Sequence, residues 1–467
     1  MSNIALNIAA SGVQADQTAM DTIAQNLSNT NTPGYVSETA NLATNPGGKP
    51  VGVGSGVRVS SVTQVSDSLL VTNAQQTSGA LAQGSALQQV LQQAQLAFQE
   101  PTSNGMSNDL ANFWQSWDAI ASNPSDPAAR IQTIDQAQTV ATDLQQANTQ
   151  LTTVAANATS ELGSVATEAN GLLSQVATLN TQIASSQFTG TSPNALIDQR
   201  NQAMNQLAKD IGAVGSTTPA GSYQVKVGNV VLVNGGWSDT LSVPAPTGTG
   251  TGIQPIGLQA KESGATVSVS AGTAAGLIAG VNNLSGFQTQ LNGVASKLYN
   301  DVNTALGNGY TYQAGVTPQV HGGPLFVTSD GSTTVTAANI SVSPAMVGTP
   351  STPGDPSMLA AATDPSNAAN DGSNAQAIAS MWNSAGGSDS LYRSLVQQVG
   401  QQVSSTNNQV QSQTAVANAA QQNLQAVTGV DPNTQLVSLM NFQQAYQAAA
   451  KVISTVDTAM QSLIAAV

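Results

Sequence analysis

Cysteine is absent from this 467-residue chain, and histidine occurs once, as His321. Without cysteine the chain has no disulfide scaffold, no thiolate nucleophile and no Cys-ligated metal site. Charged residues make up only 7% of the chain, and the formal net charge is −14. This charge disfavours both nucleic acid and an anionic membrane surface as partners. Aromatic residues make up 4%, so small apolar side chains must fill the interior.

Long apolar runs are also missing, and none approaches the roughly 20 residues that a membrane-spanning helix needs. The first twenty residues, MSNIALNIAASGVQADQTAM, contain no Lys or Arg and no uninterrupted apolar core. A cleaved secretory signal is therefore not expected. The composition leaves two locations open, the cytoplasm or the cell exterior after export without a cleaved signal.

The N-terminal segment has a heptad pattern followed by a turn. Apolar residues recur every seven positions at Leu6, Val13, Met20 and Leu27, which predicts a helix with a coiled-coil-like face. Pro33 then ends the helix, and Pro33-Gly34 suits the centre of a type II turn, where Gly supplies the positive φ. We expect Tyr35 to anchor this turn by packing.

The C-terminal segment has a longer stripe, in which apolar residues alternate three- and four-residue steps. Its members are Leu439, Phe442, Tyr446, Ala449, Ile453, Val456, Met460, Leu463 and Val467. Such a stripe is most often the buried face of an intramolecular bundle. Here it runs to the last residue of the sequence, and a matching heptad segment lies at the opposite end. We therefore expect the two ends to pair and also to form an assembly interface.

Two interior stretches predict long helices. Apolar residues keep helical spacing from Val140 to Ile183, a stretch that would make a helix longer than about 60 Å. On the returning side an apolar residue recurs every seven positions from Val396 to Leu424. Two such helices suggest an elongated antiparallel bundle. Trp114 and Trp117 are interpreted as core anchors.

Between the helical stretches the pattern changes to β structure. Alternating residues from Tyr223 to Val227 precede Gly228-Asn229, and valines follow, which predicts a hairpin. Turn-rich sequence dominates residues 240–275 and returns at 306–356. These segments indicate β structure inserted into a helical stalk.

The candidates for catalysis are weak. The stretch VGVGSGV lacks the strand–loop–helix context of a dinucleotide site, and no P-loop motif occurs. His321 is interpreted as a structural loop residue, and Asp198 and Arg200 as residues that cap or brace a helix. We therefore predict no catalytic residue, no cofactor and no metal site, and a protein that is not an enzyme.

Several blocks of the sequence resemble one family. NLSNTNTPGYVSE with GVGSGVRVSSVTQVSDSLL resembles the N-terminal segment of bacterial flagellar rod, hook and hook-associated proteins. GVDPNTQLVSLMNFQQAYQAAAKVISTVDTAMQSLIAAV resembles the C-terminal segment of the same axial family. Within the chain, LANFWQSWDAIASNPSDPAARIQTIDQAQTVATDL and LIDQRNQAMNQLAKDIG resemble the helical region of hook-associated proteins at the hook–filament junction.

The resemblance implies a structural subunit between hook and filament, with helical termini lining an inner tube. It also implies export by the flagellar type III apparatus to an extracellular position. The implied partners are further copies of the chain in a ring or helical layer, the hook protein and a second hook–filament junction protein. An export chaperone on the C-terminal segment is implied as well. The alternatives are another axial component or, less in keeping with the motifs, an unrelated helical fibre or tail protein.

The predicted fold is elongated and mainly α with an inserted β domain, in several domains. Residues 1–40 and 430–467 are expected to pair as a coiled-coil-like inner domain. The helical stalk is assigned to residues 41–213, 273–305 and 357–429, and the β-rich outer parts to 214–272 and 306–356. The predicted assembly residues are Leu6, Val13, Met20, Leu27, Leu439, Phe442, Tyr446, Ile453, Val456, Met460 and Leu463, with Pro33, Gly34 and Tyr35 as the turn motif.

Overall fold

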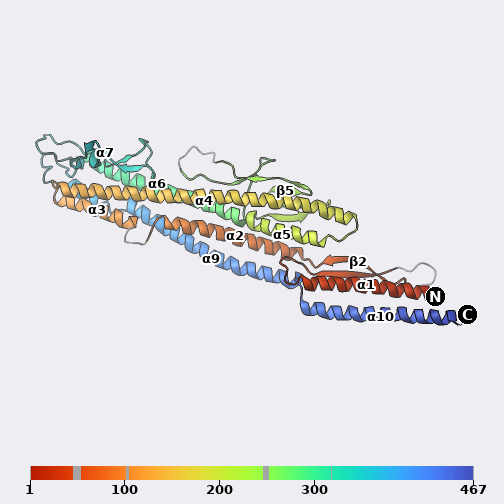
Figure 1. Ribbon diagram of the computed structural model, residues 1–467. Helices are drawn as coiled ribbons and strands as arrows, with labels where there is room; N and C mark the ends of the chain where they lie inside the picture. Colours follow the sequence, from red (N-terminus) through yellow and green to blue (C-terminus); the bar gives the residue numbers. More distant parts are fainter. Residues whose placement is uncertain (1, 46–53, 101–104, 246–251, 317, 466–467) are drawn as a thin grey trace.

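The molecule is a long helical rod with small sheets on its surface, seen in a computed structural model that describes residues 2–45, 54–100, 105–245, 252–316 and 318–465 (Figure 1). Both ends of the chain lie at the same end of the rod. The helices are α1 (Ser2–Ser28), α2 (Ser68–Leu96), α3 (Met106–Ser122), α4 (Pro127–Phe188), α5 (Asn194–Ile211), α6 (Gly272–Asn308), α7 (Pro344–Val347), α8 (Ser373–Ala379), α9 (Ser388–Thr428) and α10 (Pro432–Ala465), with a 3-10 turn η1 (Pro356–Met358).

Short antiparallel sheets lie around the helices. The strands are β1 (Glu38–Thr44), β2 (Val57–Gln64), β3 (Val214–Thr217), β4 (Tyr223–Val227), β5 (Val230–Asn234), β6 (Trp237–Ser238), β7 (Leu241–Ser242), β8 (Leu258–Ala260), β9 (Thr266–Val267), β10 (Phe326–Thr328), β11 (Ile340–Val342), β12 (Gly348–Thr349) and β13 (Thr352–Pro353). They pair in the orders β1-β2, β3-β4-β5-β6, β7-β8-β9, β10-β11 and β12-β13.

The centre of the rod is a helical bundle, as the sequence predicted. The predicted helix over 140–183 lies inside α4, which has 62 residues and is about 93 Å long at the rise of an α-helix. It begins earlier than predicted because Asp126 caps it, accepting a hydrogen bond from Ala128 N at 2.9 Å, and Pro127 occupies its first turn. The predicted returning helix is α9. It packs against α2 and α6, whereas α4 packs against α6, α5 and α3.

The large side chains of α3 fill the core at the end of the bundle remote from the termini. Trp114 and Trp117 are buried, which confirms their interpretation as core anchors. Phe113 packs between them and the β10 strand, with its ring centroid 5.9 Å from that of Phe326. Along α4 small and large apolar residues alternate in the core, as the scarcity of aromatic residues requires.

The inserted β structure covers one side of α4, which contacts β5, β6 and β7. The hairpin predicted at Gly228-Asn229 is confirmed, since β4 and β5 flank these two residues and Gly228 has a φ of +55°. The second predicted β region, 306–356, contains β10 to β13 and lies beside α6 at the remote end of the rod.

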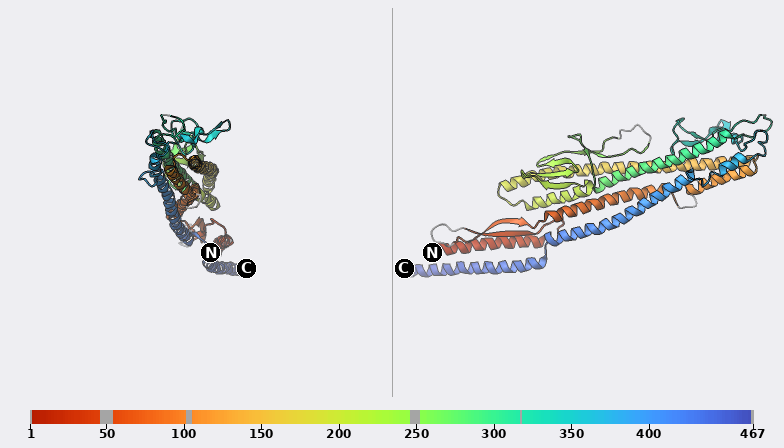
Figure 2. Two further views of the ribbon diagram at one scale, coloured as in Figure 1. Left: turned by 90° about the vertical axis from the view of Figure 1, so that its left-hand side faces the viewer. Right: turned by 180° about the vertical axis from the view of Figure 1, so that it is seen from behind.

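One domain boundary differs from the prediction. Residues 41–67 were assigned to the helical stalk, but β1 and β2 form an antiparallel ribbon that packs on α1. The stalk helix α2 starts only at Ser68, where Asp67 accepts hydrogen bonds from Leu69 N and Leu70 N. The ribbon therefore belongs with the terminal helices. Viewed from behind, these helices extend from the bundle along its long axis (Figure 2).

Candidate assembly interface

The two ends of the chain pair as antiparallel helices, which confirms the predicted pairing. In Figures 1 and 2, α1 and α10 lie side by side and run in opposite directions. A Cβ placed on Gly12 would lie 3.6 Å from that of Ala449, and Asn26 Nδ2 donates to Gln435 Oε1 at 3.1 Å. These two contacts fix the register of the pair. We call α1 and α10 the terminal helix pair.

The predicted heptad residues of α1 lie beside its buried face. Leu6, Val13, Met20 and Leu27 are half-buried, while the apolar side chains that are fully buried are Ala9, Ala15, Ala19 and Ile23. The centre of burial is thus shifted by roughly a quarter-turn of helix, at 100° per residue. The reason is that the ribbon covers α1 from a second side, as Ser11 Oγ shows by accepting from Val57 N at 3.2 Å. The heptad prediction did not include this second neighbour.

The C-terminal helix is much less covered than α1. Leu439, Phe442, Tyr446, Ile453 and Val456 are half-buried toward α1, Met460 is exposed, and the Leu463 side chain lies outside the described part of the structure. Of the α10 side chains that are described, none is fully buried. On its outer face Leu436, Val437 and Met440 are 47%, 59% and 58% exposed. We call these three residues the outer α10 patch.

The predicted turn after α1 is confirmed. Tyr35 N donates to Thr32 O at 3.2 Å and Gly34 has a φ of +80°, as in a type II turn. A Cβ at Gly34 would lie 2.5 Å from Gln202 Nε2, the group that donates to Pro33 O at 2.9 Å. Gly34 therefore supplies both the backbone geometry and the close approach to α5.

Asn26, which the sequence analysis did not single out, organises the base of the terminal helix pair. Its side chain is fully buried. The Oδ1 atom accepts from Tyr35 Oη at 2.8 Å and from Glu38 N at 2.9 Å. The Nδ2 atom donates to Glu38 O at 2.8 Å and to Gln435. All four hydrogen bonds that an amide side chain can make are thus satisfied. In the sequence Asn26 stands out only because it follows Ala19 by seven residues, the heptad spacing, and the structure shows that Ala19 is buried.

Further polar contacts join this region to the bundle. Ser37 N donates to Thr428 O at 2.9 Å, at the end of α9. Gln64 Nε2 donates to Asp198 Oδ1 at 2.8 Å. Burial raises the pKa of Asp198 to about 6, and burial together with Glu38 and Asp198 raises that of Tyr35 to about 12. These contacts bring the turn, α5 and the end of α9 together around a cavity of about 450 Å³.

The polar residues weighed as catalytic candidates have structural partners. His321 stacks on Tyr310 with ring centroids 4.4 Å apart, and its Nδ1 lies 3.1 Å from Gly309 O. The Arg200 guanidinium lies 3.9 Å from the Tyr223 ring centroid and donates to Asn180 Oδ1 at 3.2 Å. Asp198 braces a helix, as predicted, and its partner Gln64 belongs to the ribbon, which was not predicted. Among the described residues, no group of three or more His, Asp or Glu side chains is placed to hold a metal ion, and no helix is long and apolar enough to cross a membrane.

Together these features define a class of protein: an extended helical chain whose two ends pair as helices and leave apolar side chains of α10 exposed. Comparison with known protein families identifies a particular family within this class. The family model described as flagellar hook-associated protein FlgK helical domain matches residues 91–326, just over half of the chain. Models of the flagella basal body rod protein and of the C-terminal part of the FlgEFG rod proteins match residues 6–35 and 420–466. The chain belongs to the family of the flagellar hook-associated protein FlgK.

Individual relatives agree with this assignment. Flagellar hook-associated protein 1 of Salmonella typhimurium is 30% identical over 237 residues, and the match covers 49% of this chain and 42% of the relative. The Escherichia coli and Bacillus subtilis proteins of the same name are 28% and 26% identical, again with 42% of each relative covered. The match thus spans less than half the length of these relatives. The structure of the flagellar hook junction protein FlgK from Burkholderia pseudomallei has the same fold, with a TM-score of 0.63, 18% identity and coverage of 76% of this chain and all of that one.

Proposed function

We propose that this protein is a structural subunit of the bacterial flagellum that connects the hook to the filament and is needed for filament assembly. The proposal is supported by family membership and by the printed names of the relatives, which are hook-associated and hook junction proteins. The terminal helix pair would form the inner domain, the bundle the stalk, and the sheets on α4 and beside α6 the outer parts.

The observation that carries the proposal is the open surface of α10. Burying one large apolar side chain contributes about 1.5–3 kcal/mol, and the outer α10 patch leaves three such side chains largely in water. The predicted assembly residues of α1 are also only half-buried. Neighbouring subunits would cover both surfaces, which makes association favourable without any new fold.

The partners follow from this position. They are further copies of the chain in one layer, the hook protein on one side and a second hook–filament junction protein on the other. Before assembly, an export chaperone would shield the apolar C-terminal helix, since an exposed apolar face promotes aggregation. The protein would leave the cell through the flagellar export apparatus and would act as a structural component, not as an enzyme.

A truncation tests the proposal. Deleting residues 436–467 removes nearly all of α10 but none of the bundle core, so the remaining chain should fold yet fail to join the hook. Cells that carry only this truncated chain should have hooks without filaments in electron micrographs. Normal filaments and motility in these cells would contradict the proposed function.

A point substitution in the outer α10 patch separates assembly from folding. Met440→Asp places a charge on a side chain that is 58% exposed, so the melting temperature of the isolated chain should stay the same. Filament formation should nevertheless fall at least tenfold, because the carboxylate would be buried against a neighbour. Met440→Leu, which preserves the apolar surface, is the matched control and should assemble like the unchanged chain.

The alternative is another axial component, such as a distal rod or hook protein, which would share the terminal segments. Immunogold labelling of isolated hook–basal bodies distinguishes the two positions. Label at the outer end of the hook supports the junction assignment. Label along the rod or along the whole hook supports the alternative.

A further inference from the structure

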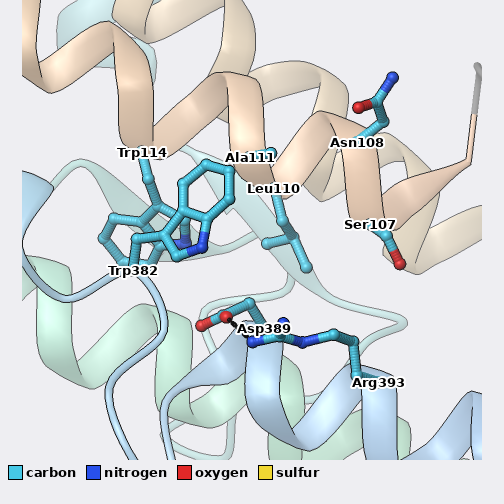
Figure 3. A pocket seen from close by; sticks show the side chains of 8 residues that line it. All are labelled: Ser107, Asn108, Leu110, Ala111, Trp114, Trp382, Asp389 and Arg393. Carbon is cyan, nitrogen blue, oxygen red and sulfur yellow. Dashed lines mark hydrogen bonds and ion pairs between the residues drawn. The ribbon is translucent and has the colours of Figure 1, made fainter.

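A cavity of about 510 Å³ lies between α3 and the start of α9, away from the terminal helix pair. It is lined by Ser107, Asn108, Leu110, Ala111, Trp114, Trp382, Asp389 and Arg393. Figure 3 shows these side chains arranged around one space, with the two indoles and Leu110 on one side and the Asp389–Arg393 pair on the other. Cavities of this size and mixed lining are typical of binding sites. We call it the Trp114–Trp382 cavity.

The apolar part of the cavity would accept an apolar side chain. Trp114 and Leu110 are buried in the core, whereas Trp382 and Ala111 are only half-buried and remain accessible. An indole offers a large, rigid apolar surface at a low cost in conformational entropy, and this makes Trp a frequent anchor at protein interfaces.

The polar part of the cavity is electrically balanced. Asp389 Oδ2 accepts from Arg393 Nη2 at 2.7 Å, and the same Nη2 donates to Asn383 Oδ1 at 2.5 Å. Since the carboxylate and the guanidinium neutralise each other, neither a cation nor an anion finds an uncompensated partner here. The cavity therefore favours an uncharged ligand.

Unused hydrogen-bonding groups define the ligand further. Trp114 Nε1 and Asp389 Oδ1 are buried and have no hydrogen-bond partner among the described residues, although their residues are only 2% and 8% exposed. Arg393, with 52% of its side chain exposed, makes its described hydrogen bonds through Nη2 alone. Arg393 thus offers donors at the open side of the site, and the unpartnered Trp114 Nε1 and Asp389 Oδ1 belong to residues of its buried wall. A peptide group, with one C=O and one N–H, matches this set.

We propose that the Trp114–Trp382 cavity binds an uncharged peptide segment of a neighbouring flagellar subunit. The segment places one apolar side chain against Trp382 and Leu110, its carbonyl against Arg393, and its N–H against Asp389. This inference rests on the proposed function for the source of the peptide, but the chemistry of the cavity is independent of it. The contact would hold the stalks of adjacent subunits together at a distance from the terminal helices.

A capped amino acid tests the chemistry on the isolated chain. N-acetyl-leucinamide should shift the indole NMR signals of Trp382 and Trp114 and leave that of Trp237, on β6, unchanged, with a dissociation constant of about 1 mM, as expected for so small a ligand. N-acetyl-glycinamide lacks the apolar side chain and should bind at least fivefold more weakly. Equal shifts with both probes, or no shift with the leucine probe, would overturn the proposal.

Two substitutions on α3 serve as a matched pair. Ala111→Phe fills the cavity from a half-buried position and should weaken binding of the leucine probe at least tenfold, whereas Ala119→Phe, exposed on the same helix, should not. If Ala111→Phe prevents folding, Arg393→Gln removes donors from a half-exposed position and should weaken binding about fivefold. A folded Ala111→Phe or Arg393→Gln chain that binds the probe normally would contradict the proposal.

Assembly on the hook distinguishes failure of this inference from failure of the proposed function. The Ala111→Phe chain should join hooks at least tenfold less often than the Ala119→Phe chain. If Ala111→Phe assembles normally and only Met440→Asp does not, the peptide site is wrong and the proposed function stands. If both variants assemble normally, the proposed function fails as well.

Discussion

At the scale of single residues, local chemistry was predictable and long-range partners were not. The turn at Pro33-Gly34 followed from the sequence because a positive φ is a local requirement that Gly meets. Asn26 was missed because its partners lie between 9 and 409 positions away along the chain. A polar residue on a buried face is a weak signal until its neighbours are known. In the structure it is the residue that ties α1 to the ribbon and to α10.

Replacing Asn26 with leucine should therefore loosen the terminal helix pair. Asn26→Leu leaves the half-buried Glu38 N–H and C=O groups and the Tyr35 hydroxyl without this partner, at up to about 1–3 kcal/mol for each group that water cannot reach. We expect the Glu38 amide to exchange its hydrogen at least tenfold faster, with no change in the bundle helices. Asn31→Ala, at an exposed position in the turn, is the control. Unchanged hydrogen exchange at the Glu38 amide in the leucine variant would show that the Asn26 hydrogen bonds add little to the stability of the terminal helix pair.

The stability of the protein should depend on pH despite its few charges. Burial raises the pKa of Asp143 to about 7, with a further contribution from Asp109, and raises those of Asp198 and Asp210 to about 6, all from 3.8. The folded chain binds these protons more tightly than the unfolded chain. The protonated carboxyl groups therefore contribute their full stabilisation of the folded state below pH 4. It is lost as the pH rises through 6 to 7.

The melting temperature should accordingly fall between pH 4 and pH 7. Asp198→Asn should reduce this fall, because a shift of about two units corresponds to about 2–3 kcal/mol at most. Gln138→Ala, at an exposed position on α4 without an ionisable group, should leave the pH profile as it is. A melting temperature that is flat or rises over this range would mean that these carboxyl groups are not held protonated in the fold.

At the scale of elements, periodicity predicted helices well but did not assign their neighbours. The stripe in α4 was visible because one face of this helix packs along the bundle for most of its length. The sequence analysis did not predict the ribbon. It therefore also missed the shift of the buried face of α1, because a heptad pattern predicts one packing partner and α1 has two, α10 and the ribbon. Apolar periodicity did not predict the packing of α2 against α6 either, because this contact depends on glycines and not on a stripe of large residues.

Gly276 and Gly280 allow this close contact. A Cβ on Gly276 would clash with the Gln83 carbonyl oxygen, and one on Gly280 would lie 2.8 Å from Val90 Cγ1. Gly276→Val should separate α2 from α6 and lower the free energy of unfolding by about 2–4 kcal/mol, a large effect for one substitution. Gly293→Ala on the same helix has open space around the added methyl group and should stabilise the protein by about 0.5–1 kcal/mol. Equal effects in denaturant titrations would contradict the glycine contact.

At the scale of the whole molecule, the architecture separates the proposed association surface from the folded core. The bundle helices carry nearly all of the largest fully buried side chains, with Phe326 added from β10, and this core gives the stalk its stability. The turn and the ribbon beside the terminal helix pair make polar contacts with the bundle, and α10 stays open. The sequence predicted that the ends would pair. It did not predict which face would stay open, because that depends on how the ribbon and α1 share their contacts.

The central claim is that the outer α10 patch becomes buried when the protein assembles. The absence of cysteine allows a direct measurement, the rate at which a maleimide labels a single cysteine introduced as Met440→Cys. Labelling should be fast in the isolated chain and at least tenfold slower once the chain is bound to hooks, while Ser351→Cys, at an exposed turn near β13, should label equally fast in both. Equal labelling of Met440→Cys before and after assembly would contradict the claim.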